Sequence, residues 1–333
     1  MPTMSDVAQR AGVATSTVSH VINRTRHVSA ETIALVERAM DDVGYIHNAL
    51  ARSLARSTTN TVGLALSSHS NIYFSDLIEA VENACARLGL MVFLADTSDD
   101  PDKEVQIVRA LHQRRVDGVI FAPSADPEQR ALGYLRKNEV PCVVLDRLVC
   151  DEFDQVGVEN TEALAGLVDH LAWHGRRRIA MLSNQAGFAT TLERIEGFKL
   201  GLAGNGLTFE PGLLELGSAD RAANVQATFR LLDQADPPTA IIGGNNLSTI
   251  SVMQALRERR LRIPADIALA GFDDFDWAEL FEPHLTVIAQ PCQKIGETAA
   301  RMLVERLKSP DRPRQTIRLA PTLIIRGSCG CEP

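Results

Sequence analysis

From Thr61 onward, short apolar runs alternate with amphipathic stretches, and this alternation limits the possible folds more than any other feature of the sequence. The apolar runs are 62–67, 91–96, 118–123 and 142–147, then a second series at 178–183, 213–217, 240–244 and 267–274. Strands that alternate with helices form parallel sheets that are covered by helices on both faces. Two series of runs therefore predict an α/β fold with two lobes of similar build.

The end of the chain adds further elements to this pattern. They are an apolar run at 285–291, a helical stretch near 292–308 and a closing stretch at 316–328. We expect the chain to cross between the lobes here, because both series are already complete. The predicted first lobe comprises about 61–158 and 290–318, and the second about 159–289 and 319–328.

The first sixty residues show a different pattern, with three short helices. Thr3 followed by Asp6 is typical of a helix start, and Gly12 of the tight turn that ends a helix. A second helix is expected from about Thr15 to Asn23, and Ser29 is placed to cap a third over 30–43. The second helix has an apolar face (Val18, Val21, Ile22) and a polar face (Thr15, Ser16, Ser19, His20). Two short helices joined at a glycine turn predict a helix-turn-helix.

Composition excludes several other classes of protein. Apolar residues make up 45% of the chain, but no uninterrupted apolar stretch is long enough to span a bilayer. The net charge of −8 lies outside the first sixty residues, which hold slightly more basic than acidic side chains. Six cysteines without a framework spacing, and no secretory signal, predict a cytoplasmic protein. Cys329 and Cys331 read as an ordinary terminus without ligand partners, so we expect neither a metal nor a cofactor.

The N-terminal segments closely resemble the DNA-binding headpiece of the LacI/GalR family of bacterial regulators. The resemblance rests on MSDVAQRAGVATSTVSHVIN (4–23), HVSAET (27–32) and GYIHNALARSLA (44–55). It implies a headpiece over 1–47, a hinge helix and linker over 48–60, and a ligand-binding and dimerisation domain over 61–333. A three-helix bundle without a DNA role is the alternative.

The resemblance also assigns roles to residues of the headpiece. Major-groove reading falls on Thr15, Ser16 and His20, and backbone contact or turn fixing on Thr17, Asn23 and His27. Within the hinge helix, Leu54 would enter the minor groove with Ala51 beside it. The chain departs from the family at Ala14, where a capping Ser is common, and at His47, where a Pro is usual.

The remainder resembles the type I periplasmic-binding-protein fold, including GFDD (271–274), PHLTVIAQP (283–291) and LIIRGS (323–328). Ligands of open α/β lobes bind beyond the carboxyl ends of the strands. The polar and aromatic candidates at these ends are Tyr73, Phe74, Asp146, Arg147, Thr190, Arg194, Asn245, Asp273 and Gln290. The family resemblance supports Arg194, Asn245, Asp273 and Gln290 most directly.

Each candidate also has a structural alternative. Asn246 could be only a helix cap, Tyr73 and Phe74 could pack the lobe, and Arg194 could pair with Asp273. Carboxylates, amides and arginines around a cleft favour a sugar or sugar phosphate over a nucleobase. The stretch 218–224 lacks the aromatic residue common in the family, which leaves room for a disaccharide.

We therefore expect a transcriptional regulator, most simply a repressor that binds a palindromic operator as a homodimer and is released by a carbohydrate effector. A corepressor with a non-sugar ligand, and a tetramer in place of a dimer, remain open. The alternatives are a solute-binding protein for sugar transport and an α/β enzyme. No phosphate-binding loop, nucleophile elbow or metal-ligand spacing supports the enzyme.

Overall fold

The computed structural model describes residues 2–23, 26–45, 58–67 and 71–331, which form two compact units, 1–59 and 60–333. The N-terminal unit contains α1 (Met4–Ala11), α2 (Thr15–Asn23) and α3 (Ala30–Val43). Its helix ends confirm the predicted signals: Thr3 and Asp6 form a reciprocal capping box, and Ser29 accepts a hydrogen bond from the Thr32 N–H. Gly12 takes a φ of +67°, which a glycine adopts without steric cost.

A small apolar core holds these three helices together. Its buried members come from all three helices: Val7, Ala8, Ala11, Val18, Val36 and Ala39. Val18 is the one fully buried side chain of α2, while Val21 and Ile22 are half-buried against the same core. The buried face of α2 is therefore opposite its polar face, as the sequence predicts.

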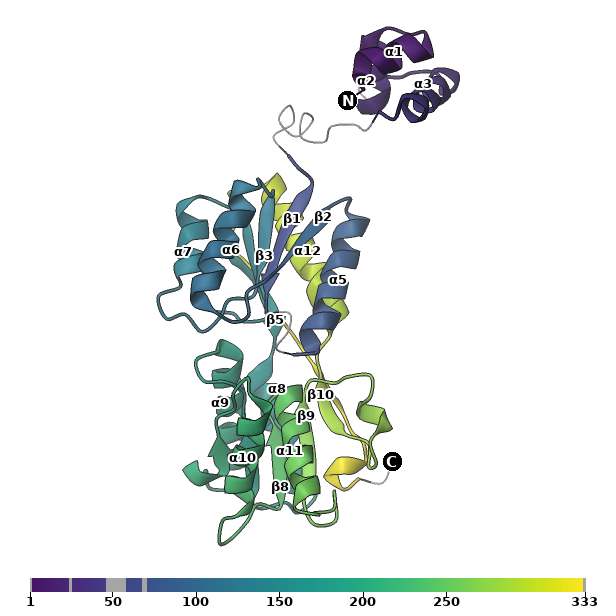
Figure 1. Ribbon diagram of the computed structural model, residues 1–333. Helices are drawn as coiled ribbons and strands as arrows, with labels where there is room; N and C mark the ends of the chain where they lie inside the picture. Colours follow the sequence, from purple (N-terminus) through teal and green to yellow (C-terminus); the bar gives the residue numbers. More distant parts are fainter. Residues whose placement is uncertain (1, 24–25, 46–57, 68–70, 332–333) are drawn as a thin grey trace. The chain divides into compact units, whose positions relative to one another are not determined.

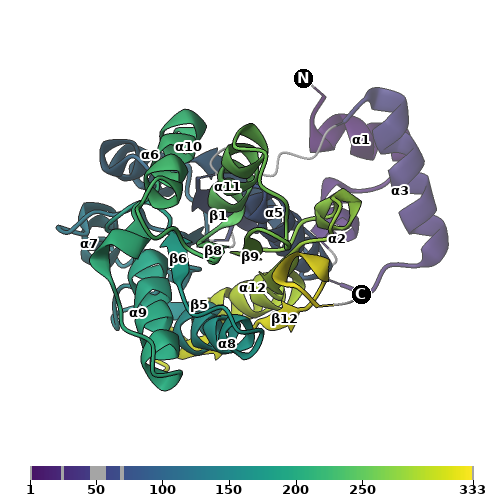
Figure 2. The same cartoon turned by 90° about the horizontal axis from the view of Figure 1, so that it is seen from below.

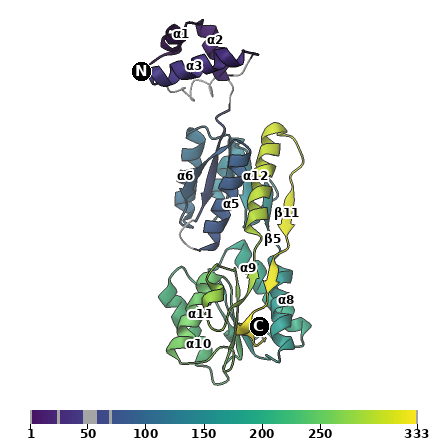
Figure 3. The ribbon, with the colours of Figure 1, turned by 90° about the vertical axis from the view of Figure 1, so that its right-hand side faces the viewer.

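The C-terminal unit contains two six-stranded sheets, each covered by helices on both faces (Figure 1). The first lobe contains β1 (Thr61–Leu66), α5 (Tyr73–Arg87), β2 (Met91–Asp96), α6 (Pro101–Gln113), β3 (Gly118–Phe121), α7 (Arg130–Lys137), β4 (Cys142–Leu145), β5 (Asp154–Val158), α12 (Cys292–Lys308) and β11 (Thr316–Leu319). Its strand order is β11-β5-β4-β3-β1-β2, and all its pairs are parallel. Side chains of α5 and α12 pack on one face and those of α6 and α7 on the other; Figure 3 shows α5 beside α12.

The second lobe repeats this plan. It contains α8 (Asn160–Trp173), β6 (Ile179–Leu182), α9 (Ala189–Gly204), β7 (Leu214–Glu215), α10 (Arg221–Leu232), β8 (Ala240–Gly243), α11 (Asn246–Glu258), β9 (Ala268–Phe272), β10 (Thr286–Ala289) and β12 (Thr322–Ile324), with short 3-10 turns at Pro211–Leu213, Ala278–Leu280 and Gly327–Cys329. The strand order is β12-β10-β9-β8-β6-β7, and only the β10–β12 pair is antiparallel. Figure 2 shows α8 and α9 on one side of this sheet and α10 and α11 on the other.

The two-lobed α/β prediction is confirmed, with one strand missed. β5 has the sequence DQVGV, which contains polar residues and therefore does not form an apolar run. Its Asp154 is nevertheless fully buried, because the Arg306 guanidinium of α12 holds the carboxylate with two hydrogen bonds of 2.9 and 3.1 Å. No helix in the described part of the chain has the length and apolar character needed to cross a bilayer.

Candidate functional site

The polar face of α2 carries the residues for which the sequence predicts contact with DNA. Thr15 and Ser16 are exposed at the start of α2, and Thr17 and His20 are half-buried beside them. Asn23 donates from Nδ2 to the Ser19 carbonyl at 2.9 Å, so it closes the last turn of the helix. This arrangement leaves the first turn of α2 open to a partner, as the recognition helix of a helix-turn-helix requires.

Three other DNA-contact candidates differ in what the structure shows. His27 lies exposed before α3. Ala51 and Leu54, together with the predicted hinge helix, lie outside the described residues. Their roles therefore stay predictions.

In the C-terminal unit, two aspartates occupy equivalent places at the ends of strands. Asp146 follows β4 and Asp273 follows β9, and both are buried. Both have left-handed backbones, with φ of +66° and +77°, and each N–H bonds to a carbonyl of the neighbouring strand at 2.9 Å. Asp tolerates this conformation better than most residues. The turn directs each carboxylate beyond the end of its sheet.

Asp146 lies in a cluster of buried first-lobe side chains. The Tyr73 hydroxyl donates to its Oδ1 at 3.0 Å, and Arg147 Nε lies 3.8 Å from its Oδ2. Burial raises the pKa of Asp146, while the charges of Arg147 and Arg194 oppose that rise. Tyr73 also packs in the lobe core with Phe74, their ring centroids 5.2 Å apart. The lobe-packing alternative for these two aromatics is therefore realised, with the Tyr73 hydroxyl left at the site.

Asp273 connects three segments of the chain. It accepts hydrogen bonds from Gln290 Nε2 at 2.6 Å and from Asn71 Nδ2 at 3.1 Å. Asn71 belongs to the first lobe, so the second of these bonds joins the lobes. Gln290 Oε1 is buried without a hydrogen-bond partner among the described residues. A buried acceptor of this kind is normally paired, in proteins, by water or a ligand.

Arg194 lies one turn after Thr190 on α9, and both side chains are buried. Its guanidinium donates to Asn160 Oδ1 at 2.9 Å and to the Gly244 carbonyl at 2.8 Å, and it covers the Phe272 ring at 3.6 Å. No ion pair joins it to Asp273 or to any other carboxylate in the described chain. The ion pair with Asp273 that the sequence allowed is therefore absent there, and the buried guanidinium bonds to neutral acceptors instead.

Asn245 and Asn246 exchange the expected roles. Asn245 caps α11 by accepting the Ser248 N–H at 2.8 Å, whereas Asn246 Nδ2 is buried without a hydrogen-bond partner among the described residues. The sequence suggested the helix cap for Asn246, but the structure gives this role to Asn245. Asn246 is therefore an additional candidate donor at this strand end.

Two cavities open near these strand ends. One, of about 440 Å³, is lined by Tyr73, Asp273 and Gln290 together with the acidic side chains of Asp76, Asp274, Asp276 and Glu279. The other, of about 380 Å³, is lined by residues of both lobes, including Glu104, Ser124 and Leu192. Arg147 is buried near the second cavity, bonded to the Pro123 carbonyl and to Asp99, and it covers the Phe188 ring of the second lobe at 4.0 Å.

The sequence reasoning missed four residues of this region: Asn160, Phe188, Glu104 and Asp99. Asn160 follows β5, so the rule of strand ends would have selected it had that strand been recognised. Phe188 precedes α9 and supplies the ring under Arg147. Nothing local in the sequence marks Glu104 or Asp99, because both are significant only through long-range contacts.

Glu104 predicts a pH dependence of stability. Burial raises its pKa from an ordinary 4.5 to about 7, against the opposing effects of the 2.5 Å hydrogen bond from Ser124 N–H and the charge of Arg147. The folded protein thus binds this proton more tightly than the unfolded chain. The associated stability is complete below about pH 4.5 and is lost as the pH rises through about 7.

The unfolding free energy of the wild type should therefore fall between pH 5 and pH 8. In the Glu104→Gln variant this fall should be smaller by about 1–3 kcal/mol. Urea titrations at the two pH values measure this difference. Glu128→Gln serves as the control, because it changes an exposed carboxyl between Pro127 and Gln129, which line the same cavity as Glu104. Equal pH dependence in the wild type and in Glu104→Gln would contradict the assignment.

Both units of the chain are similar to known proteins. Residues 3–48 match the family model "Bacterial regulatory proteins, lacI family", and residues 168–329 match the model "Periplasmic binding protein-like domain". The chain is 33% identical to the HTH-type transcriptional repressor PurR of Aliivibrio salmonicida (strain LFI1238), over 98% of this chain and 99% of the relative. It is 34% identical to the ribose operon repressor of Escherichia coli (strain K12), over 98% and 100%.

A solved structure agrees over the same length. The structure described as the Lac repressor dimer bound to operator and the anti-inducer ONPF superimposes with a TM-score of 0.88 and 28% identity, covering 98% of this chain and 99% of that one.

Proposed function

The chain belongs to the LacI family of bacterial regulatory proteins, and from this premise we propose that it is a homodimeric repressor that a small carbohydrate releases from a palindromic operator. The family membership makes it a transcriptional regulator with a periplasmic-binding-protein-like effector domain, not an enzyme. A regulator of this kind works in the cytoplasm, where its DNA lies. The N-terminal unit would read the operator through Thr15, Ser16 and His20, with the hinge residues Ala51 and Leu54 at its centre.

The single observation that carries the effector proposal is that Asp146, Asp273 and Gln290 follow strands of the two lobes and that Gln290 bonds to Asp273, while the Arg194 charge on α9 acts on Asp146. Carboxylates and an unpartnered amide oxygen accept hydroxyl protons, and a guanidinium donates to oxygen. A ligand with several neighbouring hydroxyl groups satisfies all of these. One of the relatives is described as the ribose operon repressor, which agrees with a sugar as the effector.

Ring stacking has less support in this cleft. One face of Phe188 is covered by the guanidinium group of Arg147, and one face of Phe272 by that of Arg194. The stretch from Ser218 to Asn224 holds no aromatic residue, and Asn224 is buried and bonded to the backbone of Ser218. A flat nucleobase would therefore find few free faces here, while space remains for a disaccharide or a sugar phosphate.

The contacts between the lobes suggest how such a ligand would act. Asn71 bonds to Asp273, and Arg147 stacks on Phe188, so each contact joins the first lobe to the second. Hydroxyl groups that replace the Asn71–Asp273 bond would favour a different lobe spacing. The shift would reach the operator through the hinge. The alternative is corepression, in which the ligand favours the lobe arrangement that binds DNA and therefore strengthens operator binding through the same coupling.

One experiment with the full chain tests both parts of this proposal. Duplexes selected from a random pool should converge on a two-fold symmetric site, because a symmetric dimer presents two equivalent headpieces. Fluorescence anisotropy with that site is then repeated in a panel of sugars, disaccharides, sugar phosphates and purines. Release by a sugar, with an affinity loss of tenfold or more, is expected. Tighter binding with a purine would establish the corepressor alternative, and an asymmetric selected site would contradict the dimer.

A further inference from the structure

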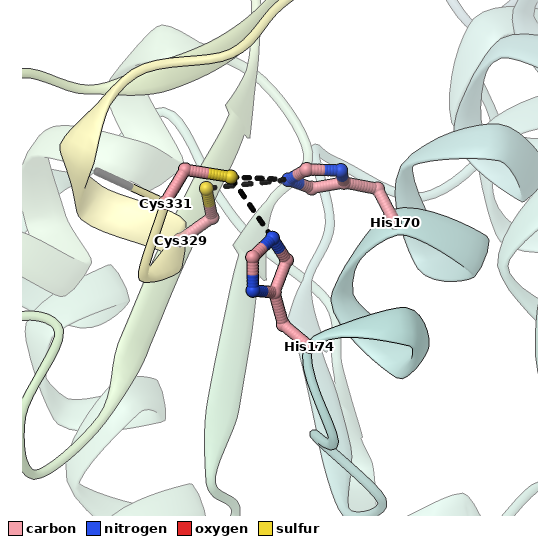
Figure 4. Close-up of side chains that lie close together, drawn as sticks. All are labelled: His170, His174, Cys329 and Cys331. Atoms are coloured by element: carbon pink, nitrogen blue, oxygen red, sulfur yellow. Dashed lines mark hydrogen bonds between the residues drawn. The ribbon is translucent and has the colours of Figure 1, made fainter. Parts of the chain in front are cut away.

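The C-terminal Cys-Gly-Cys segment meets two histidines at the end of α8 (Figure 4). His170 Nε2 lies 3.2 Å from Cys329 Sγ and 3.7 Å from Cys331 Sγ, and His174 Nε2 lies 2.9 Å from Cys331 Sγ. The four ligand atoms all lie within 4.8 Å of one another. The expectation that these thiols have no partners is therefore wrong, because partners 157 or more residues earlier were not visible in the local sequence.

The cluster is held in place by bonds that do not involve its own ligand atoms. Ser328 donates from Oγ to the Leu269 carbonyl at 2.6 Å and accepts the Thr286 N–H at 2.8 Å, which ties the segment to β9 and β10. Gly330 takes a φ of +108°, a conformation that L side chains rarely adopt, and it lies between the two thiols. On the other side, His170 lies in the last turn of α8, and His174, four residues later, is its C-cap residue. The ligand set is thus assembled by the fold itself.

We propose that His170, His174, Cys329 and Cys331 form a tetrahedral site for a zinc ion. Two thiolates and two imidazoles are an established ligand set for structural zinc, and softer ligands of this kind do not suit magnesium or calcium. Zn–S bonds of about 2.3 Å and Zn–N bonds of about 2.0–2.1 Å require ligand atoms about 3.3–3.8 Å apart around a tetrahedron. The present spacings, from 2.9 Å up to 4.8 Å, bracket that range, so small side-chain rotations suffice.

The surroundings suit the charge and the geometry of this ion. Thr286 donates from Oγ1 to Cys329 Sγ at 3.2 Å, a contact that orients the sulfur as outer hydrogen bonds do at metal sites. Cys329 is buried and His174 is only half-buried, so the site has an inner sulfur and an access route from solvent. Two thiolates balance the double charge of the ion.

The position of the cluster defines its consequence for the protein. α8 begins at Asn160, which bonds to Arg194, and the helix rises about 15 Å from there to His170, the first residue of the cluster. Zinc would therefore clip the C-terminal segment onto α8 at the end remote from the effector site. The ion should stabilise the second lobe without changing the contacts of the cleft.

The test uses the full chain, purified under reducing conditions and stripped with a chelator. Elemental analysis should find one zinc ion bound per wild-type chain. At a free zinc concentration of a hundred times the dissociation constant, the melting midpoint of the wild type should rise by about 5 °C or more. Cobalt, added in place of zinc, should show the absorption of a tetrahedral thiolate complex. Cys331→Ser and His174→Gln should each lose the zinc-dependent shift.

Two controls separate metal binding from other effects. Cys150→Ser removes a half-buried free thiol of the first lobe and should keep both the zinc and the shift. The metal-free midpoints of both ligand variants should match that of the metal-free wild type, and His174→Gln alone carries the test if Cys331→Ser does not fold. Absence of a shift in wild type, an equal shift in all variants, or a Cys329–Cys331 disulfide that persists in reductant would overturn the proposal. Operator binding does not enter this readout.

Discussion

The Arg194→Met variant is expected to bind the effector about 10- to 100-fold more weakly than wild type while retaining its affinity for the operator. Arg194 is buried, and within the described chain its guanidinium bonds to the Asn160 amide and the Gly244 carbonyl rather than to a carboxylate, so its charge is not neutralised by an ion pair there. Hydrogen bonds to charged groups contribute about 1.5–3 kcal/mol, which corresponds to this range. Isothermal titration measures effector affinity, and anisotropy measures operator affinity.

Glu196→Gln is the matched control, because Glu196 is exposed on the same helix. It should leave both affinities unchanged. Arg194 also bonds to Asn160 and to the Gly244 carbonyl, so the Met variant should melt somewhat earlier than wild type. Full effector affinity in a folded Arg194→Met protein would show that the guanidinium serves only these internal contacts.

A second large effect is expected at the ion pair that joins α12 to β5. Arg306→Met should lower the unfolding free energy of the C-terminal unit by about 3–5 kcal/mol, because it leaves the Asp154 carboxylate buried and without its cation. Asp154 is fully buried, and the Arg306 side chain is only 6% exposed. The guanidinium also donates to the carbonyls of Pro310 and Arg312, so the substitution removes the bonds that hold the turn before β11. Urea denaturation followed by circular dichroism measures the loss.

Arg301→Met provides the comparison on the same helix. Arg301 pairs with Glu305 at 3.2 Å, but both side chains are about half exposed. Exposed pairs of this kind contribute about 0.3–0.5 kcal/mol in helices. A similar loss in the two variants would mean that the stability of α12, rather than the buried pair, is being measured.

The fold was largely predictable because its signals are local. Each apolar run has the length and flanking turns of a strand, and the caps at Thr3 and Ser29 mark helix starts through contacts three residues away. β5 escaped this reasoning because its buried Asp154 is compensated by Arg306, 152 residues later. A strand that buries a charge cannot be recognised by its apolar pattern.

The positions of the strand-end candidates were predictable from the sequence, but their bonding was not. The rule that ligands bind beyond strand ends selects Asp146 and Asp273, and the structure brings both to the same region. The strand-end rule does not say which partner each side chain has. Asn245 proved to be the cap of α11, and Arg194 proved to bond to Asn160 rather than to Asp273.

The sequence by itself determined the two-lobed α/β architecture, the helix-turn-helix and the choice of strand-end residues. These follow from periodicity, capping and turn chemistry, which act over a few residues. The tertiary structure alone decided the raised pKa of Glu104, the partners of Arg194 and the meeting of His170 with Cys329. These depend on burial and on distances between segments far apart in the chain, and such distances exist only after the sheets and helices have packed.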